Sequence, residues 1–151
     1  MPKPPRRRLA ARATPKPRPV TPLPPEERVS PVDVRLVRGK GGPETGGGPG
    51  GEAWAIFLKA SRAGRIYINW IDEPPIGSHA SIQIYLNRQS QGRGVGRIAY
   101  RLASEESQYD IIYAHMRKSN EASRRAAVAA GYEDVTPAGH SQCLMRWARQ
   151  P

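Results

Sequence analysis

Three glycines at alternate positions, Gly92, Gly94 and Gly96, form the part of the chain whose composition best suits the binding of an anion. They follow a strand-like apolar alternation at residues 82–87, and a helical apolar pattern begins directly after them. The first N–H groups of a helix lack backbone partners, and glycines let a phosphate approach them closely. The cations around this turn are Arg88, Arg93 and Arg97. The segment therefore predicts a cradle for a phosphate-containing ligand.

The glycine spacing excludes two familiar nucleotide motifs. A P-loop ends in Gly-Lys-Ser/Thr, whereas Gly96 is followed by Arg97 and Ile98. A dinucleotide-binding turn has the spacing G-x-G-x-x-G and an acidic residue about 20 positions later, and neither is present here. On this motif alone, one alternative stays open: the glycines could form a turn that only packs closely and binds no ligand.

A second block of sequence narrows the choice. It runs from Asn120 through Ser123 and Arg125 to the pair Gly131-Tyr132, and an apolar strand pattern at 111–116 precedes it. The first block, Gln91-Gly92-Arg93-Gly94-Val95-Gly96, is similar to the Gln/Arg-x-x-Gly-x-Gly/Ala signature of the GNAT superfamily of acyl-coenzyme A N-acyltransferases. The second resembles that family's Asn-x-x-Ala/Ser helix closing in Gly-Phe/Tyr. The resemblance covers residues 52–148 and is closest to the branch that includes the ribosomal-protein N-terminal acetyltransferases.

The resemblance implies a fold, a cofactor and a set of binding residues. It implies transfer of an acetyl group from acetyl-CoA to a primary amine on a protein or small molecule. The amides around the glycines would hold the pyrophosphate, the strand end at 86–88 would run beside the pantetheine arm, and Asn120 would hydrogen-bond that arm. The implied cofactor-binding residues are Leu86, Arg88, Gln91, Gly92, Arg93, Gly94, Val95, Gly96, Arg97 and Asn120.

The catalytic groups are less clearly marked than the cofactor site. Many members of the family carry a tyrosine seven residues after the helix asparagine, and Ala127 stands at that position. Ser123 is a candidate to assist thiolate departure, although a serine there also bonds locally in many helices. His115, at the end of the strand that should flank the thioester, is a candidate base because histidine titrates near neutrality. Other candidate bases are Glu52, Asp72, Glu73 and His79.

Three further expectations concern the oxyanion donor, the acceptor side and metal binding. A strand amide near Tyr85 or Leu86 would meet the oxyanion of the tetrahedral intermediate. Aromatic side chains at strand spacing, Tyr67, Trp70 and Tyr85, are candidates to line the acceptor side, or plain core. Three scattered histidines and one cysteine, Cys143, make no ligand cluster, so we expect no metal.

The elements that must position these residues follow from periodicity. Strands are predicted at 52–60, 65–71, 80–87, 111–116 and 141–148, with a turn at Ala63-Gly64. Apolar residues from Val95 at helical spacing predict a helix ending near Ser107. Asn120 caps a second helix, which runs to Ala130 and ends at Gly131. Its predicted buried face is Ala122, Ala126, Ala127 and Ala130.

These elements predict an α+β (mixed αβ) domain at 52–151. It has the GNAT fold, with a central mixed, mostly antiparallel sheet flanked by helices and N-terminal helices reduced or absent. Within residues 32–51, a first strand is predicted at 32–38 and a glycine-rich linker follows it. Residues 1–31 contain ten prolines and predict a disordered basic tail.

Charge and composition add expectations about partners. The formal net charge is +11, and residues 1–25 hold seven basic residues and no acid, so residues 1–18 could contact a polyanion. No apolar run is long enough for a membrane span and no secretory signal is present, so we expect a cytoplasmic protein. We also expect a monomer or homodimer. Two alternatives stay open: a nucleic-acid binding or modifying protein, and a GNAT fold that binds coenzyme A without catalysis.

Overall fold

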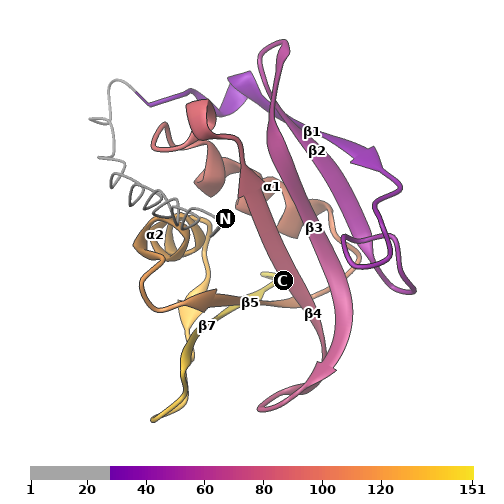
Figure 1. Ribbon diagram of the computed structural model, residues 1–151, viewed down its shortest axis with the longest axis vertical. Helices are drawn as coiled ribbons and strands as arrows, with labels where there is room; N and C mark the ends of the chain where they lie inside the picture. The colour runs from indigo at the N-terminus through magenta and orange to yellow at the C-terminus, as the bar shows by residue number, and fades with distance from the viewer. Residues whose placement is uncertain (1–27) are drawn as a thin grey trace, which may run out of the picture.

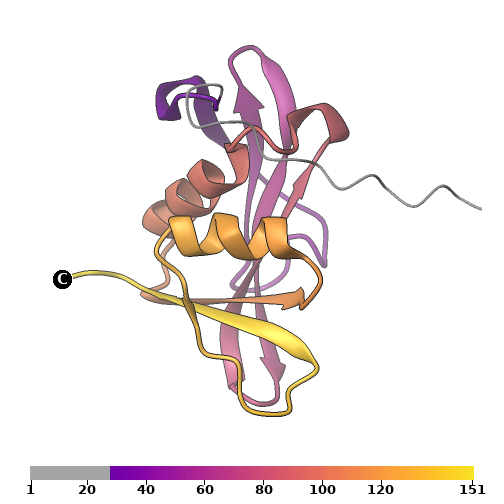
Figure 2. The same cartoon turned by 90° about the vertical axis from the view of Figure 1, so that its left-hand side faces the viewer.

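The computed structural model describes residues 28–151, and one seven-stranded sheet with two α-helices accounts for most of them (Figures 1 and 2). The strands are β1 Val34–Gly39, β2 Glu52–Leu58, β3 Ser61–Glu73, β4 Gly77–Leu86, β5 Ile111–Arg117, β6 Glu133–Asp134 and β7 Gln142–Ala148. The helices are α1 Val95–Glu106 and α2 Glu121–Ala129, and short 3-10 turns lie at Pro31–Asp33 and Arg88–Ser90. The mixed αβ class and the flanked sheet predicted from the sequence are confirmed for this part of the chain.

Local sequence explains where the helices begin and end. The apolar stripe predicted for α1 is buried at Val95, Ile98, Ala99 and Ala103. Asn120 caps α2, because its side-chain oxygen accepts a hydrogen bond from the N–H of Ser123. Gly131, with φ of +98°, ends the helix in the left-handed conformation that favours glycine.

The sheet consists of two antiparallel parts joined by a short parallel seam. Its strand order is β1-β2-β3-β4-β5-β7-β6. Strands β1 to β4 pair antiparallel along most of their length, as do β5, β7 and β6. Between β4 and β5 only two positions pair, Ala80 with Ile112 and Ser81 with Tyr113. Beyond them the strands diverge, as Figure 1 shows, and the seam opens toward the start of α1.

Both helices pack on the same face of the sheet (Figure 2). Helix α1 contacts β1 to β4, and α2 contacts α1, β5 and β6. The core between the helices and the sheet contains fully buried apolar side chains such as Ile56, Ile66, Ile82, Ala99 and Ile112. No described helix covers the other face of β1 to β4, where Tyr85 is 63% exposed.

Several sequence predictions need correction. The turn predicted at Ala63-Gly64 is wrong: β2 and β3 join at Lys59-Ala60, and Gly64 lies inside β3 opposite Leu86. Ala122 was predicted to be buried in the core but is exposed, because α2 turns it toward a cavity rather than the sheet. The two-residue strand β6 was missed.

The glycine-rich segment 39–51 connects β1 to β2, and β1 belongs to the same sheet as the rest of the fold. Asn69 on β3 fixes the segment, since its side chain bonds the N–H of Gly46 and the carbonyl of Glu44. Residues 1–27 of the predicted tail, including the polyanion contact predicted for residues 1–18, lie outside the described residues. The last residues of that tail are ordered, contrary to the prediction, since the N–H of Val29 donates to the Arg93 carbonyl and a 3-10 turn begins at Pro31.

No helix in residues 28–151 has the length and apolarity that a membrane crossing requires. In the same part of the chain, no group of three or more histidine, cysteine or acidic residues is arranged to hold a metal ion.

Candidate functional site

A cavity of about 420 Å³ lies where α1 begins, between β4 and α2. Strand β4 supplies its apolar wall through Ile84 and Leu86. The glycine turn supplies the end wall, and α2 supplies the side opposite β4. The remaining lining residues are Arg28, Gln91, Gly92, Gly94, Val95, Gly96, Arg97, Tyr100, Asn120, Ala122, Ser123, Arg125, Ala126 and Ala129.

The glycine turn exposes backbone at the entrance to this cavity. Gly92 and Gly94 have φ angles of +73° and +85°, which side-chain-bearing residues rarely adopt. Gly94 is the N-cap of α1 and has no side chain to bond the first helical N–H groups. Those groups, and the positive end of the helix dipole, therefore stay available to an anion at the turn.

The Arg97 side chain adds an unsatisfied donor to the same place. Its Nε is buried and has no hydrogen-bond partner among the described residues. A Cβ atom added at Gly94 would lie 3.1 Å from this Nε, so the glycine leaves the guanidinium room. A buried donor without an acceptor is costly, and an anionic ligand beside α1 would satisfy it.

Helix α2 contributes polar groups to the cavity wall. The Asn120 oxygen is used for the helix cap, which leaves its amide N–H groups as donors. The Ser123 hydroxyl bonds the Tyr100 hydroxyl across the two helices at 2.9 Å. Burial raises the pKa of Tyr100, so this phenol stays protonated. The cavity thus contains a neutral pair of hydroxyls.

Most of the predicted cofactor residues gather at this cavity. Those lining it are Leu86, Gln91, Gly92, Gly94, Val95, Gly96, Arg97 and Asn120, joined by Ser123. Gln91 also donates from its side chain to the Leu86 carbonyl at 3.1 Å, which ties the turn to the end of β4. Arg88, Arg93 and His115 are not among the lining residues. Arg93 instead accepts, through its carbonyl, a hydrogen bond from the N–H of Val29.

His115 lies on β5, and its Nε2 is 2.8 Å from the Nε2 of His79 on β4. The Nδ1 of His79 lies 2.7 Å from the Gly77 carbonyl, which can only accept, so that nitrogen carries a proton. When His79 is neutral its Nε2 is then an acceptor, and the Nε2 of His115 must donate to it. The Nδ1 of neutral His115 is left with a lone pair.

This arrangement allows the pair to take up one proton. Protonating the Nδ1 of His115 keeps the bond between the two rings intact, whereas a second proton would set two N–H groups against each other. Burial, and secondarily His79, lowers the pKa of His115, while Glu73 opposes the shift and His140 adds to it. His115 is therefore neutral at pH 7 and able to accept a proton.

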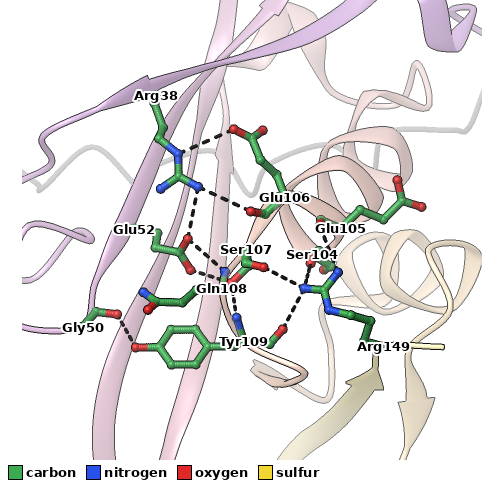
Figure 3. Close-up of polar contacts among 10 residues, drawn as sticks. All are labelled: Arg38, Gly50, Glu52, Ser104, Glu105, Glu106, Ser107, Gln108, Tyr109 and Arg149. Atoms are coloured by element: carbon green, nitrogen blue, oxygen red, sulfur yellow. Dashed lines mark hydrogen bonds and ion pairs between the residues drawn. The ribbon is translucent and has the colours of Figure 1, made fainter. Parts of the chain in front are cut away.

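Of the other candidate bases, His79 is the hydrogen-bond partner of His115, and the three carboxylates lie elsewhere. Glu52 is buried beside the end of α1, where it accepts from the Ser107 hydroxyl and the N–H of Gln108 and pairs with Arg38 at 3.3 Å (Figure 3). Those contacts occupy its oxygens and indicate a structural role. Asp72 and Glu73 are exposed near the β3–β4 hairpin.

Sequence reasoning missed Tyr100 and Arg28 as cavity residues. Tyr100 lies between the apolar positions of α1, so its pattern resembles core, and only the packing of α1 against α2 brings it to Ser123. Arg28 precedes the first element and reaches the cavity because Val29 is anchored to the turn. Neither position carries a local signal for this contact.

Comparison with known proteins gives a family and a set of similar folds. Residues 17–133 match the acetyltransferase (GNAT) domain family. No curated protein matches the chain in sequence.

Three solved structures illustrate the similarity of fold. The microcin C7 self-immunity acetyltransferase MccE, solved with acetyl-CoA and AMP, is 20% identical with a TM-score of 0.52 over 67% of this chain and 62% of that one. RimJ from Mycobacterium smegmatis, solved with CoA-disulfide, is 18% identical with a TM-score of 0.52 over 65% and 53%. AAC(6')-Ib, solved with paromomycin and acetyl-CoA, is 18% identical with a TM-score of 0.54 over 66% of each chain. The chain thus spans 62% and 53% of the first two, and at these identities the likeness establishes the fold.

Proposed function

Since the chain belongs to the GNAT acetyltransferase domain family, we propose that it transfers an acetyl group from acetyl-CoA to a primary amine. The observation that carries the proposal is the cavity at the start of α1, where glycine backbone, a helix N-terminus and a buried unpaired donor converge. These are the features that a nucleotide diphosphate requires.

The chain's own groups would divide the cofactor between them. The amides from Gly92 to Gly96 and the Arg97 guanidinium bind the pyrophosphate. The diverging edge of β4 at Ile84 to Leu86 runs beside the pantetheine arm, because its backbone has no strand partner on the β5 side beyond Ser81. The Asn120 amide N–H groups donate to that arm.

His115 takes the proton in this scheme. The amine nitrogen bonds to the thioester carbonyl carbon, the carbon–sulfur bond breaks, and the amine proton goes to the Nδ1 of His115. A β4 amide near Tyr85 or Leu86 donates to the developing oxyanion. His79 holds the ring of His115 in the tautomer that leaves Nδ1 free, through the hydrogen bond between the two Nε2 atoms.

The hydroxyl pair supplies the group for the departing sulfur. The Ser123 hydroxyl donates a hydrogen bond to the thiolate, and the Tyr100 hydroxyl holds Ser123 in place. This pair compensates for Ala127, which is fully buried and carries no donor.

The test combines binding and turnover on the full chain. Calorimetry should detect acetyl-CoA binding, and a panel of primary amines should release free coenzyme A. His115→Asn should lower kcat about 100-fold or more, in the range of general base catalysis, and leave the Kd for acetyl-CoA within twofold. Absence of acetyl-CoA binding would overturn the proposal.

A second candidate function is coenzyme A binding without catalysis. It is favoured by Ala127, since the position that often carries the family's general acid is apolar here. Binding of acetyl-CoA with no turnover of any amine would support this candidate. Turnover that depends on Ser123 and His115 would exclude it.

A further inference from the structure

The face of β1 to β4 that points away from the helices, here called the outer face, has a distinct composition. Strand register places its side chains in rows across the sheet. One row joins Arg35, Phe57 and Arg62, and a second joins Val37, Ala55, Arg65 and Tyr85. The third row joins Gly39, Ala53, Tyr67 and Gln83. None of the positions in these three rows is acidic, and the acidic residue on the same face, Glu73, lies at the far end of β3.

Arginines and aromatic rings are stacked on this face. The Arg35 guanidinium lies 4.7 Å from the centre of the Phe57 ring. The Arg65 guanidinium lies 5.9 Å and 5.7 Å from the rings of Tyr67 and Tyr85. Arg35, Arg62 and Arg65 make no ion pair with any other described residue. Each therefore keeps guanidinium N–H groups for an external anion.

The outer face is also hollowed. A cavity of about 380 Å³ is lined by Val37, Phe57, Arg62, Arg65 and Tyr67, with the glycine-rich segment at its edge. It lies on the opposite side of the sheet from the cavity at α1. A ligand there would contact aromatic surface and arginines at once.

The charge of the face restricts its occupant. A second copy of the chain would set arginines against arginines, and like charges across an interface are unfavourable. The chain's first 25 residues are basic without an acid, so they are repelled as well. An apolar helix would bury the three arginines without partners, which is costly. The partner must be anionic and must also use the aromatic rings.

We propose that the outer face of β1 to β4 binds single-stranded nucleic acid. Phosphates bind the free N–H groups of Arg35, Arg62 and Arg65, and unpaired bases stack on the exposed rings and guanidinium planes. Open four-stranded sheets with aromatic side chains stack two or three bases in this way. A duplex is disfavoured because its bases are already stacked within it. The cavity of the outer face is separate from the acetyl-CoA cavity at the start of α1, and binding there does not rest on the proposed reaction.

The experiment measures fluorescence anisotropy of the full chain with labelled 12-nucleotide oligo(U) and oligo(dT) and with a 12-base-pair duplex. Both single strands should bind more tightly than the duplex. The variant R35A/R62A/R65A should lose at least tenfold in affinity. Its salt dependence should also weaken, with the slope of log K against log salt falling by about 2 for three lost phosphate contacts.

Two further variants separate stacking from general attraction. The control R101A/K118A/R124A removes the same charge away from the outer face and should change affinity less than threefold. Tyr85→Ala leaves the charge unchanged and should lose about fivefold or more, as expected when a stacked base loses its ring. A far-ultraviolet circular dichroism spectrum and a cooperative unfolding transition like those of the unchanged chain verify that each variant is folded.

Three outcomes would overturn the proposal. The first is equal affinity for duplex and single strand. The second is an equal loss in the control triple variant, which would indicate attraction by net charge alone. The third is an unaffected Tyr85→Ala together with full competition by polyglutamate, which would assign the face to acidic peptides.

Discussion

Gly94 combines two constraints at one residue, a left-handed backbone and a neighbouring guanidinium. Its φ of +85° is unfavourable for any residue with a Cβ, and that Cβ would lie 3.1 Å from the Nε of Arg97. We expect Gly94→Ala to cost about 1–2 kcal/mol of stability through the backbone alone. It should also weaken acetyl-CoA binding, because Arg97 must move.

Gly139 provides a matched control for this prediction. It has a similar φ of +76°, and an added Cβ would meet nothing within 4 Å. Gly139→Ala should therefore lose a similar amount of stability in chemical denaturation while the Kd for acetyl-CoA stays unchanged. Equal Kd values for the two variants would contradict a binding role for the glycine turn.

His115 determines the expected pH dependence of turnover. Burial and His79 lower its pKa below the ordinary value of 6.5, and the base must be neutral to accept a proton. We expect kcat/KM to be constant near pH 7 and to fall on the acid side with a midpoint below 6.5. A pH–rate profile checks this, and His115→Asn should remove that limb from the residual activity.

The lowered pKa of His115 should also make the free energy of unfolding depend on pH. The native pKa of His115 is lower than its unfolded value, so between the two the unfolded state binds more protons. The contribution to the unfolding free energy is therefore complete above pH 6.5 and decreases as pH falls below it. An increase in that contribution on acidification would contradict the pKa shift.

At the residue scale, the sequence predicted those features that depend only on residues adjacent along the chain. The glycine turn, the Asn120 cap and the glycine after α2 are local features, and all are present. The Tyr100–Ser123 contact and the unsatisfied Nε of Arg97 depend on how two helices pack. No pattern within either helix encodes that distance, so neither could be predicted.

Among the elements, β3 and β4 leave no room for a side chain at Gly64. A Cβ there would lie 2.0 Å from the Tyr85 carbonyl oxygen and 2.9 Å from the Cα of Leu86. We expect Gly64→Ala to cost about 2–3 kcal/mol, since backbone must shift to relieve the overlap. Because Leu86 lines the cavity, affinity for acetyl-CoA should fall as well. Denaturant titration and calorimetry measure the two effects.

Gly39, at the end of β1, is the control for Gly64. An added Cβ there meets nothing within 4 Å. Gly39→Ala should be neutral or slightly stabilising, because alanine loses less conformational freedom on folding. If both alanine variants were neutral, close approach of β3 and β4 would not explain the glycine inside the strand.

Glu52, the first residue of β2, links this strand to the end of α1 through its side chain (Figure 3). Its carboxylate accepts from the Ser107 hydroxyl and the Gln108 N–H, while Arg149 donates to the Ser107 and Tyr109 carbonyls nearby. Glu52→Ala would leave buried donors without an acceptor. We expect a loss of about 2–4 kcal/mol in the free energy of unfolding.

Glu106 tests whether that loss comes from burial or from the ion pair. It also pairs with Arg38, at 3.5 Å, but its side chain is 49% exposed. Glu106→Ala should cost less than about 1 kcal/mol, as exposed ion pairs do. Equal losses in the two variants would assign the effect to Arg38 rather than to the buried hydrogen bonds.

Element prediction succeeded where periodicity extended over several turns or pairs. The helices α1 and α2 and most strands lie within a few residues of their predicted bounds. The turn at Ala63-Gly64 was wrong because glycine next to a small residue also occurs where two strands meet closely, and only the sheet distinguishes the two. The two residues of β6 are too few to form a pattern.

For the whole molecule, the alternation of strands and helices predicted the fold class. The same reasoning could not give the extent of the β4–β5 seam, because pairing of two positions rather than seven leaves the pattern of either strand unchanged. The sequence shows no helical period in residues 32–51, and in the described part of the chain no α-helix connects β1 to β2.

The uneven charge of the chain leads to a prediction about its first 27 residues. Their removal takes away seven basic and two acidic residues, so the formal net charge falls from +11 to +6. We expect the shortened chain to bind all polyanions more weakly and with a smaller salt slope. Its preference for single strands over duplex, and its turnover of acetyl-CoA, should persist. Loss of that preference would attribute it to the removed segment.

The narrow β4–β5 seam has a consequence for how long the protein survives in a cell. In the proposed reaction, acetyl-CoA occupies the opening between β4 and β5. It would then bridge two halves of the sheet that otherwise share two paired positions. Ligand that binds only the native state adds RT ln(1 + [L]/Kd) to its stability. Starvation that depletes acetyl-CoA would then expose the chain to proteolysis, and its abundance would follow the metabolic supply.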